Sequence, residues 1–470
     1  MTGSGADLRA LAASNPVHFM GVGGAGMCAL AELLLRSGGR VTGCDIKASQ
    51  ASADLIELGA VLTTGHGAEH VADASALVIT AAVAADHPEV LAARERGIPV
   101  LKRAEALGAW VNRGTLVAIA GTHGKTTTTA MVTEILSGAG LDPTGLVGGR
   151  VRGWAGNLRF GSDSLFIVEA DEYDRSFHTL TPDVAVVTNV EADHLDVYGD
   201  YAGVKEGFAT FLDGMRKPGR VIGCADDPGS SALLSRVGSA GYSYGLSAGS
   251  MLRGTDVKVT AESTSCQVLE EGSPAGRLTL PVGGLHNLRN ALGAAAAARA
   301  LNVRWLDIFE GLSGFAGVGR RFELLGSAKG VVLLDDYAHH PTEIRAALSA
   351  ARSMYPDARL VVAFQPHLFS RTRDFAAEFG SALAEADAVW ITDVFPAREA
   401  PLPGITGQTV VDAVQHAGGP EPRYVADLAE LPEALAEELR EGDLLVTLGA
   451  GSIESLGKAV LERLEAHVHA

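Results

Sequence analysis

The sequence is poor in cysteine and in clustered positive charge. Its four cysteines lie far apart with no C-x-x-C pair, which disfavours a disulfide framework or a zinc site and indicates a reducing compartment. Lysine and arginine number 38 against 56 acidic residues, so the net charge is −18, and no dense basic run occurs. Nucleic acid is therefore not expected as a partner, because binding to a phosphate backbone needs clustered cations.

Long apolar segments are also missing. The longest alanine-rich run, 291–301, is interrupted by Arg299 and is too short to span a bilayer. The N-terminus has neither a basic stretch nor an apolar core, so no signal peptide is expected. We therefore predict a cytoplasmic protein with no membrane insertion. With 47% hydrophobic and 20% charged residues over 470 positions, the chain should fold into two or three domains.

A strand, a glycine turn and a helix start follow one another in the second quarter of the chain. The apolar run 116–120 predicts a buried strand, and apolar residues recur at helical spacing over 130–136. Between them the turn reads G-x-x-G-K-T, from Gly121 to Thr126, which is shorter than the common G-x-x-x-x-G-K-[ST]. Backbone N–H groups at such a helix start bind phosphate, Lys125 would reach the terminal phosphates and Thr126 would ligate Mg²⁺. A glycine turn merely capped by threonines is the alternative.

The first hundred residues contain another glycine turn, which we call the first glycine turn; the turn from Gly121 to Thr126 is the second. A strand is expected at 17–21, a helix at 27–36 and another strand at 40–44, which ends in Asp45 at the distance expected for ribose contact. The turn between the first strand and the helix has G-x-G-x-x-G spacing, with Gly21, Gly23 and Gly26. Alone, this motif suggests NAD, but its glycines suit any ligand whose diphosphate approaches the backbone. A packing role for the glycines is the alternative.

The two nucleotide-binding turns must be explained together. A dehydrogenase does not need the second turn, and a simple nucleoside triphosphatase does not need the first. An enzyme that uses ATP to join a nucleotide-linked substrate to another molecule needs both. We expect the boundary between the two parts near residues 111–114, a short polar break before the second strand.

Acidic and histidine side chains follow two predicted strands of the middle part. The apolar run 165–168 is followed by Glu169, Ala170, Asp171 and Glu172. The run 184–187 leads into TNVEADHLD, which carries Asp193, His194 and Asp196. The carboxyl ends of parallel strands are where α/β sheets bind ligands, so these residues favour a Mg²⁺ site, with His194 acceptable as an indirect contact. Solvated acidic loops are the alternative.

The pattern changes again after residue 245. Short alternating runs at 257–260, 265–269 and 277–280 predict a small antiparallel sheet inserted in the middle domain. Asn287 and Asn290 then open an alanine-rich helix, where they could read an adenine edge or cap the helix.

Alternating strands and helices begin again near residue 319. The predicted strands end near residues 335, 365, 393 and 449, and each is followed by a polar or glycine-bearing loop. Candidate side chains for clamping phosphate or carboxylate gather on these loops: Arg320, Arg321, Arg371 and Arg373, beside His339, His340 and His367. The pattern indicates a third doubly wound domain that faces the ATP site.

Eight segments resemble motifs of the Mur ligase family and occur in the family's order: HFMGVGGAGM, AGTHGKTTTT, EADEYDRSF, TNVEADHLD, GLHNLRNALGA, GRRFE, DDYAHHPTE and FQPHLFSRT. The resemblance covers about Val17 to Ser452 and is strongest to the alanine-adding members. It implies an ATP-dependent ligase that joins L-alanine to the carboxylate of UDP-N-acetylmuramate through an acyl phosphate. That reaction adds the first amino acid of the peptidoglycan stem peptide, which implies roles in cell-wall biogenesis, cell shape and cell division.

The resemblance also implies the architecture and the ligands. The fold is expected to be α/β with three domains: a Rossmann-like UDP-sugar-binding domain (1–112), a central P-loop ATPase domain with an inserted antiparallel sheet (113–317) and a Rossmann-like amino-acid-binding ligase domain (318–470). ATP and Mg²⁺ are the expected cofactors, and UDP-N-acetylmuramate and L-alanine the expected substrates. The first glycine turn would hold the diphosphate of the UDP-sugar rather than NAD, and the protein would be a monomer or homodimer.

Site residues carry over by position from the motifs. The resemblance implies that the catalytic residues are Lys125, Glu169, His194 and Arg321. The implied ATP-binding residues are Gly121, Thr122, His123, Gly124, Lys125, Thr126, Thr127, His286, Asn287, Asn290, Arg320 and Asp336. The implied UDP-sugar-binding residues are Gly21, Gly23, Gly24, Ala25, Gly26, Asp45 and Thr80. The implied amino-acid-binding residues are Tyr337, His339 and Arg371, and the implied metal-site residues are Thr126, Glu169 and His194.

Two positions depart from relatives, and one lysine needs comment. Leu368 stands where many relatives carry arginine, and Ser452 stands where aspartate is common. Several other Mur ligases use a carbamylated lysine near the second metal; Lys205 is the only lysine shortly after His194, and we do not assign it that role. Leu368 leaves open a ligase of the same fold that adds another amino acid or a preformed peptide. A separate alternative is a nucleotide-responsive binding protein, in which the turn at Gly121 is a sensor and the first domain binds NAD.

Overall fold

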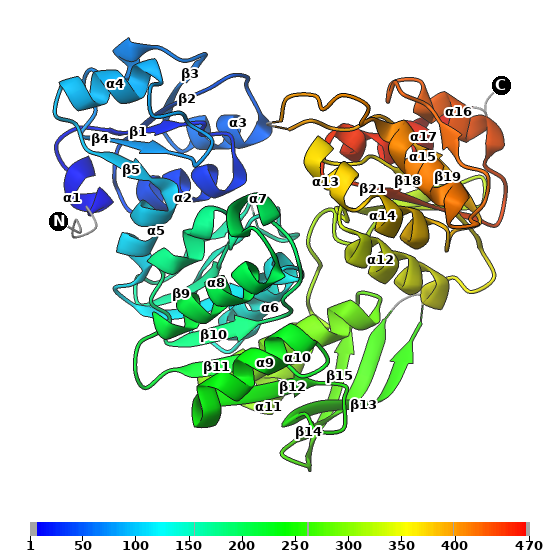
Figure 1. The fold of residues 1–470 in the computed structure, drawn as a ribbon. Coiled ribbons are helices and arrows are strands. Elements are labelled where there is room, and N and C mark those ends of the chain that lie inside the picture. The colour runs from blue at the N-terminus through cyan, green and yellow to red at the C-terminus, as the bar shows by residue number, and fades with distance from the viewer. Residues whose placement is uncertain (1–6, 155, 261–262, 398, 467–470) are drawn as a thin grey trace. The chain divides into compact units, whose positions relative to one another are not determined.

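The computed structural model describes residues 7–154, 156–260, 263–397 and 399–466. They form three β-sheets with helices on their faces, which confirms the predicted three-part α/β fold (Figure 1). The chain divides into two compact units, of which the second contains Gly317 onward together with Val257–Ser265 and Leu280–Leu288. The domain boundaries expected near residues 112 and 317 stay predictions.

The first sheet is parallel, in the order β3-β2-β1-β4-β5. Its strands are β1 (Val17–Met20), β2 (Val41–Asp45), β3 (Val61–Thr64), β4 (Ala76–Ile79) and β5 (Val100–Lys102). Its helices are α1 (Leu8–Ala12), α2 (Ala25–Arg36), α3 (Gln50–Glu57), η1 (Ala68–Val71), α4 (Pro88–Glu95) and α5 (Arg103–Val111). Helices α2 and α4 cover opposite faces (Figure 1). The strand order reverses between β1 and β4, which places a ligand-binding crevice at the carboxyl ends of these two strands.

The central sheet has ten strands in the order β15-β14-β13-β12-β11-β10-β6-β9-β7-β8. They are β6 (Thr115–Ala120), β7 (Thr144–Leu146), β8 (Leu158–Arg159), β9 (Leu165–Glu169), β10 (Val184–Val187), β11 (Arg220–Cys224), β12 (Gly241–Gly245), β13 (Leu252–Val259), β14 (Thr264–Glu270) and β15 (Ser273–Leu280). The strands expected as an inserted sheet, β13 to β15, extend the edge of this sheet, because β13 pairs in parallel with β12. The turn between β14 and β15 has only two residues, which permits only an antiparallel pair.

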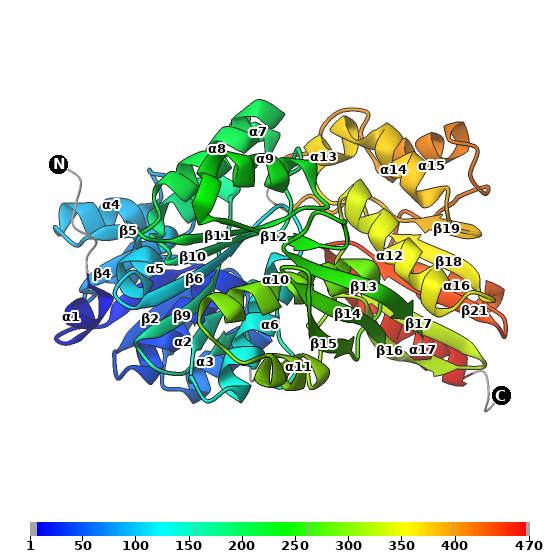
Figure 2. The ribbon, with the colours of Figure 1, turned by 90° about the horizontal axis from the view of Figure 1, so that it is seen from below.

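Helices cover both faces of the central sheet. They are α6 (Lys125–Gly138), η2 (Tyr173–Thr179), α7 (Leu195–Tyr198), α8 (Tyr201–Asp213), α9 (Pro228–Val237), η3 (Gly238–Ala240), α10 (Leu285–Ala300) and α11 (Trp305–Ser313). Figure 2 shows α8 and α9 on one face and α6 and α11 on the other. Strand β6 lies between β9 and β10, with Ile119 opposite Glu169 and Ala120 opposite Val187. This register brings the glycine turn after β6 next to the acidic segments after β9 and β10.

The third sheet has the order β16-β17-β21-β18-β19-β20, with only β16 antiparallel to its neighbour. Its strands are β16 (Glu323–Ala328), β17 (Val331–Asp336), β18 (Arg359–Phe364), β19 (Ala388–Ile391), β20 (Arg423–Tyr424) and β21 (Asp443–Leu448). Its helices are α12 (Pro341–Met354), α13 (Phe369–Asp374), α14 (Ala376–Leu383), α15 (Gly407–His416), α16 (Leu431–Glu438), η4 (Ser452–Ser455) and α17 (Leu456–Ala466).

Side chains of β18 alternate between two cores, as a strand covered on both faces requires. Leu360 and Val362 pack with α12, α14 and α15, whereas Val361 and Ala363 pack with α16 and α17. Across the described residues, none of the helices has the length and apolar character needed to cross a bilayer.

Candidate active site

The second glycine turn has room for no other residue type at two positions. Gly121 (φ +133°) follows β6, and a Cβ there would lie 2.0 Å from the Thr188 hydroxyl. Gly124 (φ +81°) begins α6, and a Cβ there would lie 2.5 Å from Oδ1 of Asn290. No described side chain caps this helix start. The turn therefore presents backbone N–H groups and the positive end of a helix dipole, which is an anion-binding arrangement.

Lys125 points back over this turn. Its Nζ donates to the carbonyl oxygens of Gly121 (2.6 Å) and Thr122 (3.0 Å) and to Oε1 of Glu172 (2.9 Å). Burial would lower the pKa of Lys125, but Glu172 and the neighbouring carboxylates outweigh it and raise the pKa, so the ammonium stays charged. Burial raises the pKa of Glu172 to about 7 even beside Lys125.

Glu172 belongs to the acidic segment that the sequence predicts for the metal, but it is not among the residues implied by the family motifs. It lies three positions beyond Glu169 in the acidic segment after β9, and only 3% of its side chain is exposed. Its Oε1 also lies 3.9 Å from Nε2 of His194. What marks Glu172 as a site residue is that its carboxylate is buried between a lysine and a histidine. This arrangement appears only in the folded chain.

Two of the predicted metal-site residues touch directly. The Thr126 hydroxyl donates to Oε1 of Glu169 (3.1 Å), and the other oxygen of Glu169 accepts the Gly148 N–H (2.6 Å). Mg²⁺ takes oxygen ligands at about 2.0–2.1 Å in an octahedron, so two of its ligands lie about 3 Å apart. The spacing and chemistry of the two oxygens therefore fit this ion. His194, in a left-handed conformation (φ +53°), approaches the same region through Glu172.

The other predicted ATP residues around the turn are held by the segment after β10. The Thr122 hydroxyl accepts the Glu191 N–H (2.9 Å), and the His123 N–H donates to Oδ1 of Asn189 (2.8 Å). Thr127 is buried in α6. In the second unit, the Asn287 amide donates to the Gly283 carbonyl (2.8 Å), a local contact at the start of α10, and the ring of His286 lies 6.4 Å from that of Phe322.

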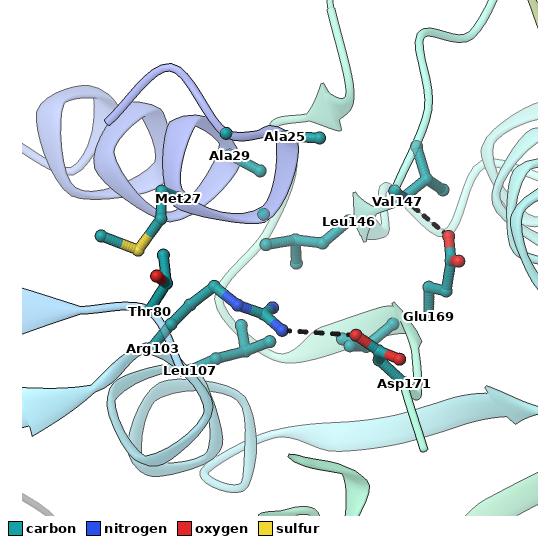
Figure 3. A pocket seen from close by; sticks show the side chains of 14 residues that line it. Ala25, Met27, Ala29, Thr80, Arg103, Leu107, Leu146, Val147, Glu169 and Asp171 are labelled. Atoms are coloured by element: carbon teal, nitrogen blue, oxygen red, sulfur yellow. Dashed lines mark hydrogen bonds and ion pairs between the residues drawn. The ribbon is translucent and has the colours of Figure 1, made fainter. Parts of the chain in front are cut away.

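The first glycine turn opens onto a cavity of about 290 Å³ (Figure 3). The residues that line it are Gly24, Ala25, Gly26, Met27, Ala29, Thr80, Arg103, Leu107, Leu146, Val147, Gly148, Val168, Glu169 and Asp171. Four of the predicted UDP-sugar residues are among them. The far wall comes from the central sheet and includes Glu169, the carboxylate that contacts Thr126 beside the second glycine turn.

Arg103 is the cation in this cavity, and the motifs did not indicate it. Its guanidinium lies 3.7 Å from Asp171, and Figure 3 shows the two side chains pointing toward one another. A Cβ on Gly26 would lie 2.9 Å from this guanidinium, so a larger residue there would require the Arg103 side chain to shift. Asp45 acts within the turn, where its Oδ2 accepts the Gly23 N–H (2.9 Å).

The predicted residues of the third sheet lie near the end of β17. Asp336 is buried and accepts the N–H groups of Phe322 and Ala338, both at 2.7 Å. Burial raises the pKa of Asp336 to about 7, against the effect of Arg321. The guanidinium groups of Arg320 and Arg321 lie 5.1 and 5.0 Å from the centre of the Tyr337 ring. Arg320 is also tied to Asp335 (3.0 Å).

A histidine pair continues this group. Nδ1 of His339 lies 2.9 Å from the Tyr337 carbonyl oxygen, and its ring lies 5.5 Å from that of His367. Nη1 of Arg371 lies 3.3 Å from Nδ1 of His367. The structure therefore brings the three predicted amino-acid residues together, with His367 as the link between two of them.

Three sequence models of the Mur ligases match consecutive parts of the chain: the Mur ligase family, catalytic domain, over residues 16–115, the Mur ligase middle domain over 119–298 and the Mur ligase, glutamate ligase domain, over 320–451. The chain belongs to the Mur ligase family. Members of this family use ATP, in agreement with the anion-binding turn at Gly121.

Individual relatives are similar over nearly the whole chain. The UDP-N-acetylmuramate–L-alanine ligase of Geobacter sp. strain M21 is 44% identical over 96% of this chain and 98% of its own length. The ligase of the same name from Solidesulfovibrio magneticus is 44% identical, covering 95% and 97%. The crystal structure of the UDP-N-acetylmuramate-alanine ligase of Thermotoga maritima superimposes with a TM-score of 0.83 at 29% identity, covering 96% and 100%. A murein peptide ligase from Psychrobacter arcticus, 24% identical with a TM-score of 0.72 and coverage of 96% and 98%, shares the fold.

The three positions compared with relatives in the sequence analysis have local contacts in the structure. Leu368 is buried in a left-handed conformation (φ +69°) just before α13. The Ser452 hydroxyl accepts from the side-chain amide of Gln365 (3.2 Å). Lys205 is exposed, with its Nζ 4.7 Å from the centre of the Tyr201 ring.

Proposed function

We propose that this Mur ligase joins L-alanine to the carboxylate of UDP-N-acetylmuramate, driven by ATP, as the first amino-acid addition in peptidoglycan stem-peptide synthesis. The observation that carries the proposal is the position of Glu169. One carboxylate lines the cavity of the first glycine turn and contacts Thr126 at the second. A substrate carboxylate held in that cavity would therefore lie on one side of Glu169, and the terminal phosphate of ATP would lie on the other.

The chemistry explains why two anion sites are needed. A carboxylate is a poor acyl donor, so one of its oxygens attacks the γ-phosphorus of ATP and ADP leaves. The neutral amine of alanine then attacks the carbonyl carbon of the acyl phosphate. Inorganic phosphate leaves with the bonding electrons, and the nitrogen gives up one proton. Negative charge accumulates on the phosphoryl oxygens in the first step. Lys125, whose ammonium stays charged, and the N–H groups at the start of α6 face that charge.

Thr126 and Glu169 would hold Mg²⁺, with His194 nearby through Glu172. When bound, Mg²⁺ neutralises phosphate charge and orients the phosphate chain. Arg103 supports diphosphate binding beside Gly24 to Gly26, because a guanidinium fork matches phosphate oxygens.

In the second unit, Tyr337, His339 and Arg371 are the residues proposed to receive alanine. A buried arginine beside histidine suits a carboxylate ligand. Asp336 and Arg321 are proposed to contact ATP. Because the reaction consumes ATP, we infer that the protein works in the cytoplasm. We also propose that it is a monomer or a homodimer.

Phosphate release tests the proposal. The purified chain is given ATP, Mg²⁺ and UDP-N-acetylmuramate with alanine, glycine, serine, glutamate or a preformed peptide in turn. We expect the highest kcat/KM with alanine, and no release without the sugar nucleotide. A Lys125→Ala chain controls for contaminating enzymes and should be inactive. Turnover with glutamate or the peptide but not with alanine would overturn the proposal, as would tight binding of NAD without binding of the UDP-sugar.

A further inference from the structure

Four potential metal ligands meet on one face of the first sheet, outside the two sites described above. They are His18 on β1, Cys44 on β2, His70 in η1 and Glu89 in α4. Because strand side chains alternate, His18 points away from α2 and toward the α4 side, whereas its neighbours Val17 and Phe19 pack with α2. Each of the four residues offers one ligand atom, and these atoms all lie within 4.8 Å of one another.

Several distances between the ligand atoms are close to those around a tetrahedral ion. Nε2 of His18 lies 3.4 Å from Sγ of Cys44 and 3.5 Å from Oε2 of Glu89. Sγ of Cys44 lies 3.3 Å from Oε1 of Glu89, and Nδ1 of His70 lies 3.2 Å from the same oxygen. Zinc–ligand bonds of about 2.0–2.3 Å in a tetrahedron separate the ligand atoms by about 3.3–3.8 Å.

The surroundings orient these ligands as they would in a metal centre. Nδ1 of His18 lies 2.9 Å from the Thr42 hydroxyl, which leaves Nε2 for an ion. The Gly67 N–H donates to Glu89 (2.9 Å). Such second contacts fix the tautomer of a metal-bound histidine and the direction of a metal-bound carboxylate.

The exposure of the four ligands also fits a structural ion, because they are mostly buried but one side of the site is open. His18 and Glu89 are 2% and 0% exposed, and Cys44 is buried, whereas His70 is 14% exposed. His66, at 23% exposure, places Nδ1 3.1 Å from Sγ of Cys44 at the open side. An ion can therefore enter past the two outer histidines and reach the buried thiol and carboxylate.

We propose that His18, Cys44, His70 and Glu89 bind one Zn²⁺. Binding forms a Zn–S bond and releases the thiol proton of Cys44 to solvent, so one thiolate and one carboxylate balance the charge of the ion. With four protein ligands the site is structural. It also stabilises the first glycine turn, because the Cys44 carbonyl accepts the N–H groups of Gly21 (2.8 Å) and Val22 (3.1 Å).

Metal analysis of the untagged full-length chain tests this proposal. The protein is equilibrated with Zn²⁺, dialysed against zinc-free buffer and measured by mass spectrometry of its metal content. We expect one zinc per chain in the wild type and in Cys224→Ser, a control at another buried cysteine. The zinc content of Cys44→Ser should be lower than that of the wild type by about tenfold or more. A wild-type chain without zinc, or a Cys44→Ser chain with the wild-type amount, would overturn the proposal and leave a purely hydrogen-bonded cluster.

A spectroscopic readout covers the possibility that Cys44→Ser folds poorly. Co²⁺ in place of Zn²⁺ should give a thiolate-to-metal charge-transfer band in the wild type, together with the intense visible bands of a tetrahedral ion. Thr42→Val, which removes only the partner of His18, should weaken zinc binding by about 10- to 100-fold while circular dichroism stays unchanged. A cobalt spectrum without the thiolate band would rule out Cys44 as a ligand.

Discussion

Arg103 places a guanidinium in the cavity beside the first glycine turn, and a diphosphate there would accept its N–H groups. Charge-assisted hydrogen bonds contribute about 1.5–3 kcal/mol, so Arg103→Ala should raise the KM for UDP-N-acetylmuramate by about 10- to 100-fold. The KM for ATP should change little. Lys102→Ala is the control, because Lys102 is the adjacent cation and its side chain, paired with Asp174 at 2.8 Å, is 53% exposed. Equal effects of the two substitutions would contradict the assignment of Arg103.

Glu172 makes stability depend on pH. Its pKa is raised from the ordinary 4.5 to about 7 in the folded chain, chiefly by burial, so the folded state binds a proton more tightly than the unfolded state does. The free energy of unfolding should therefore fall as pH rises through this range. Glu172→Gln is the control, because its amide does not titrate and its oxygen can still accept a hydrogen bond from Lys125.

Thermal melts from about pH 5 to about pH 8 test this. As pH rises over this range, the melting temperature of the wild type should fall by more than that of Glu172→Gln. Parallel curves for the two proteins would show that Glu172 does not titrate differently on folding.

At the scale of the element, α6 is bounded by two glycines of nearly equal conformation. Gly124 (φ +81°) begins it, and Gly140 (φ +80°) lies just beyond its end. Alanine at either position costs about 1–2 kcal/mol of stability because of the left-handed backbone. Only at Gly124 would the new methyl group also meet Asn290, at 2.5 Å, whereas a methyl group at Gly140 would have no described atom within 4 Å apart from its chain neighbours.

Gly124→Ala should therefore lower kcat/KM for ATP by about 100-fold, because small displacements of a phosphate-binding turn have large effects. Gly140→Ala should lower the melting temperature by a similar amount and leave the kinetics unchanged. Steady-state assays with varied ATP and thermal melts of both variants provide the comparison. Normal kinetics in Gly124→Ala would remove this turn from the ATP site.

At the scale of the whole molecule, the residues proposed for one reaction are divided between two compact units. Lys125 and Glu169 belong to the first unit, and Arg321 and Asp336 belong to the second. Because both sets are proposed to act on one nucleotide, we expect the units to close on it. Small-angle scattering should show a smaller radius of gyration with UDP-N-acetylmuramate and a non-hydrolysable ATP analogue together. In Lys125→Ala the ATP analogue should no longer decrease the radius of gyration. An unchanged radius of gyration in the wild type would contradict closure.

Much of the fold follows from local patterns. The apolar runs at 116–120 and 184–187 were sufficient to predict β6 and β10, because continuous apolar segments of that length bounded by glycine or polar residues favour buried parallel strands. The runs at 257–260, 265–269 and 277–280 likewise predict β13 to β15. Their membership of the central sheet was not expected, because the pairing of β13 with β12 depends on contacts between segments rather than on either segment alone.

The sequence alone determined the α/β class, both glycine turns and the relation to the Mur ligases, since these depend on residue order within short segments. The tertiary structure decided that Arg103 lies in the first cavity, that Glu172 pairs with Lys125 and that His18, Cys44, His70 and Glu89 meet. Spacing along the chain gave no sign of that last cluster, and its lack of paired cysteines had disfavoured zinc. Strand register and the direction of each side chain set which distant residues touch, and both are properties of the packed sheets rather than of any single segment.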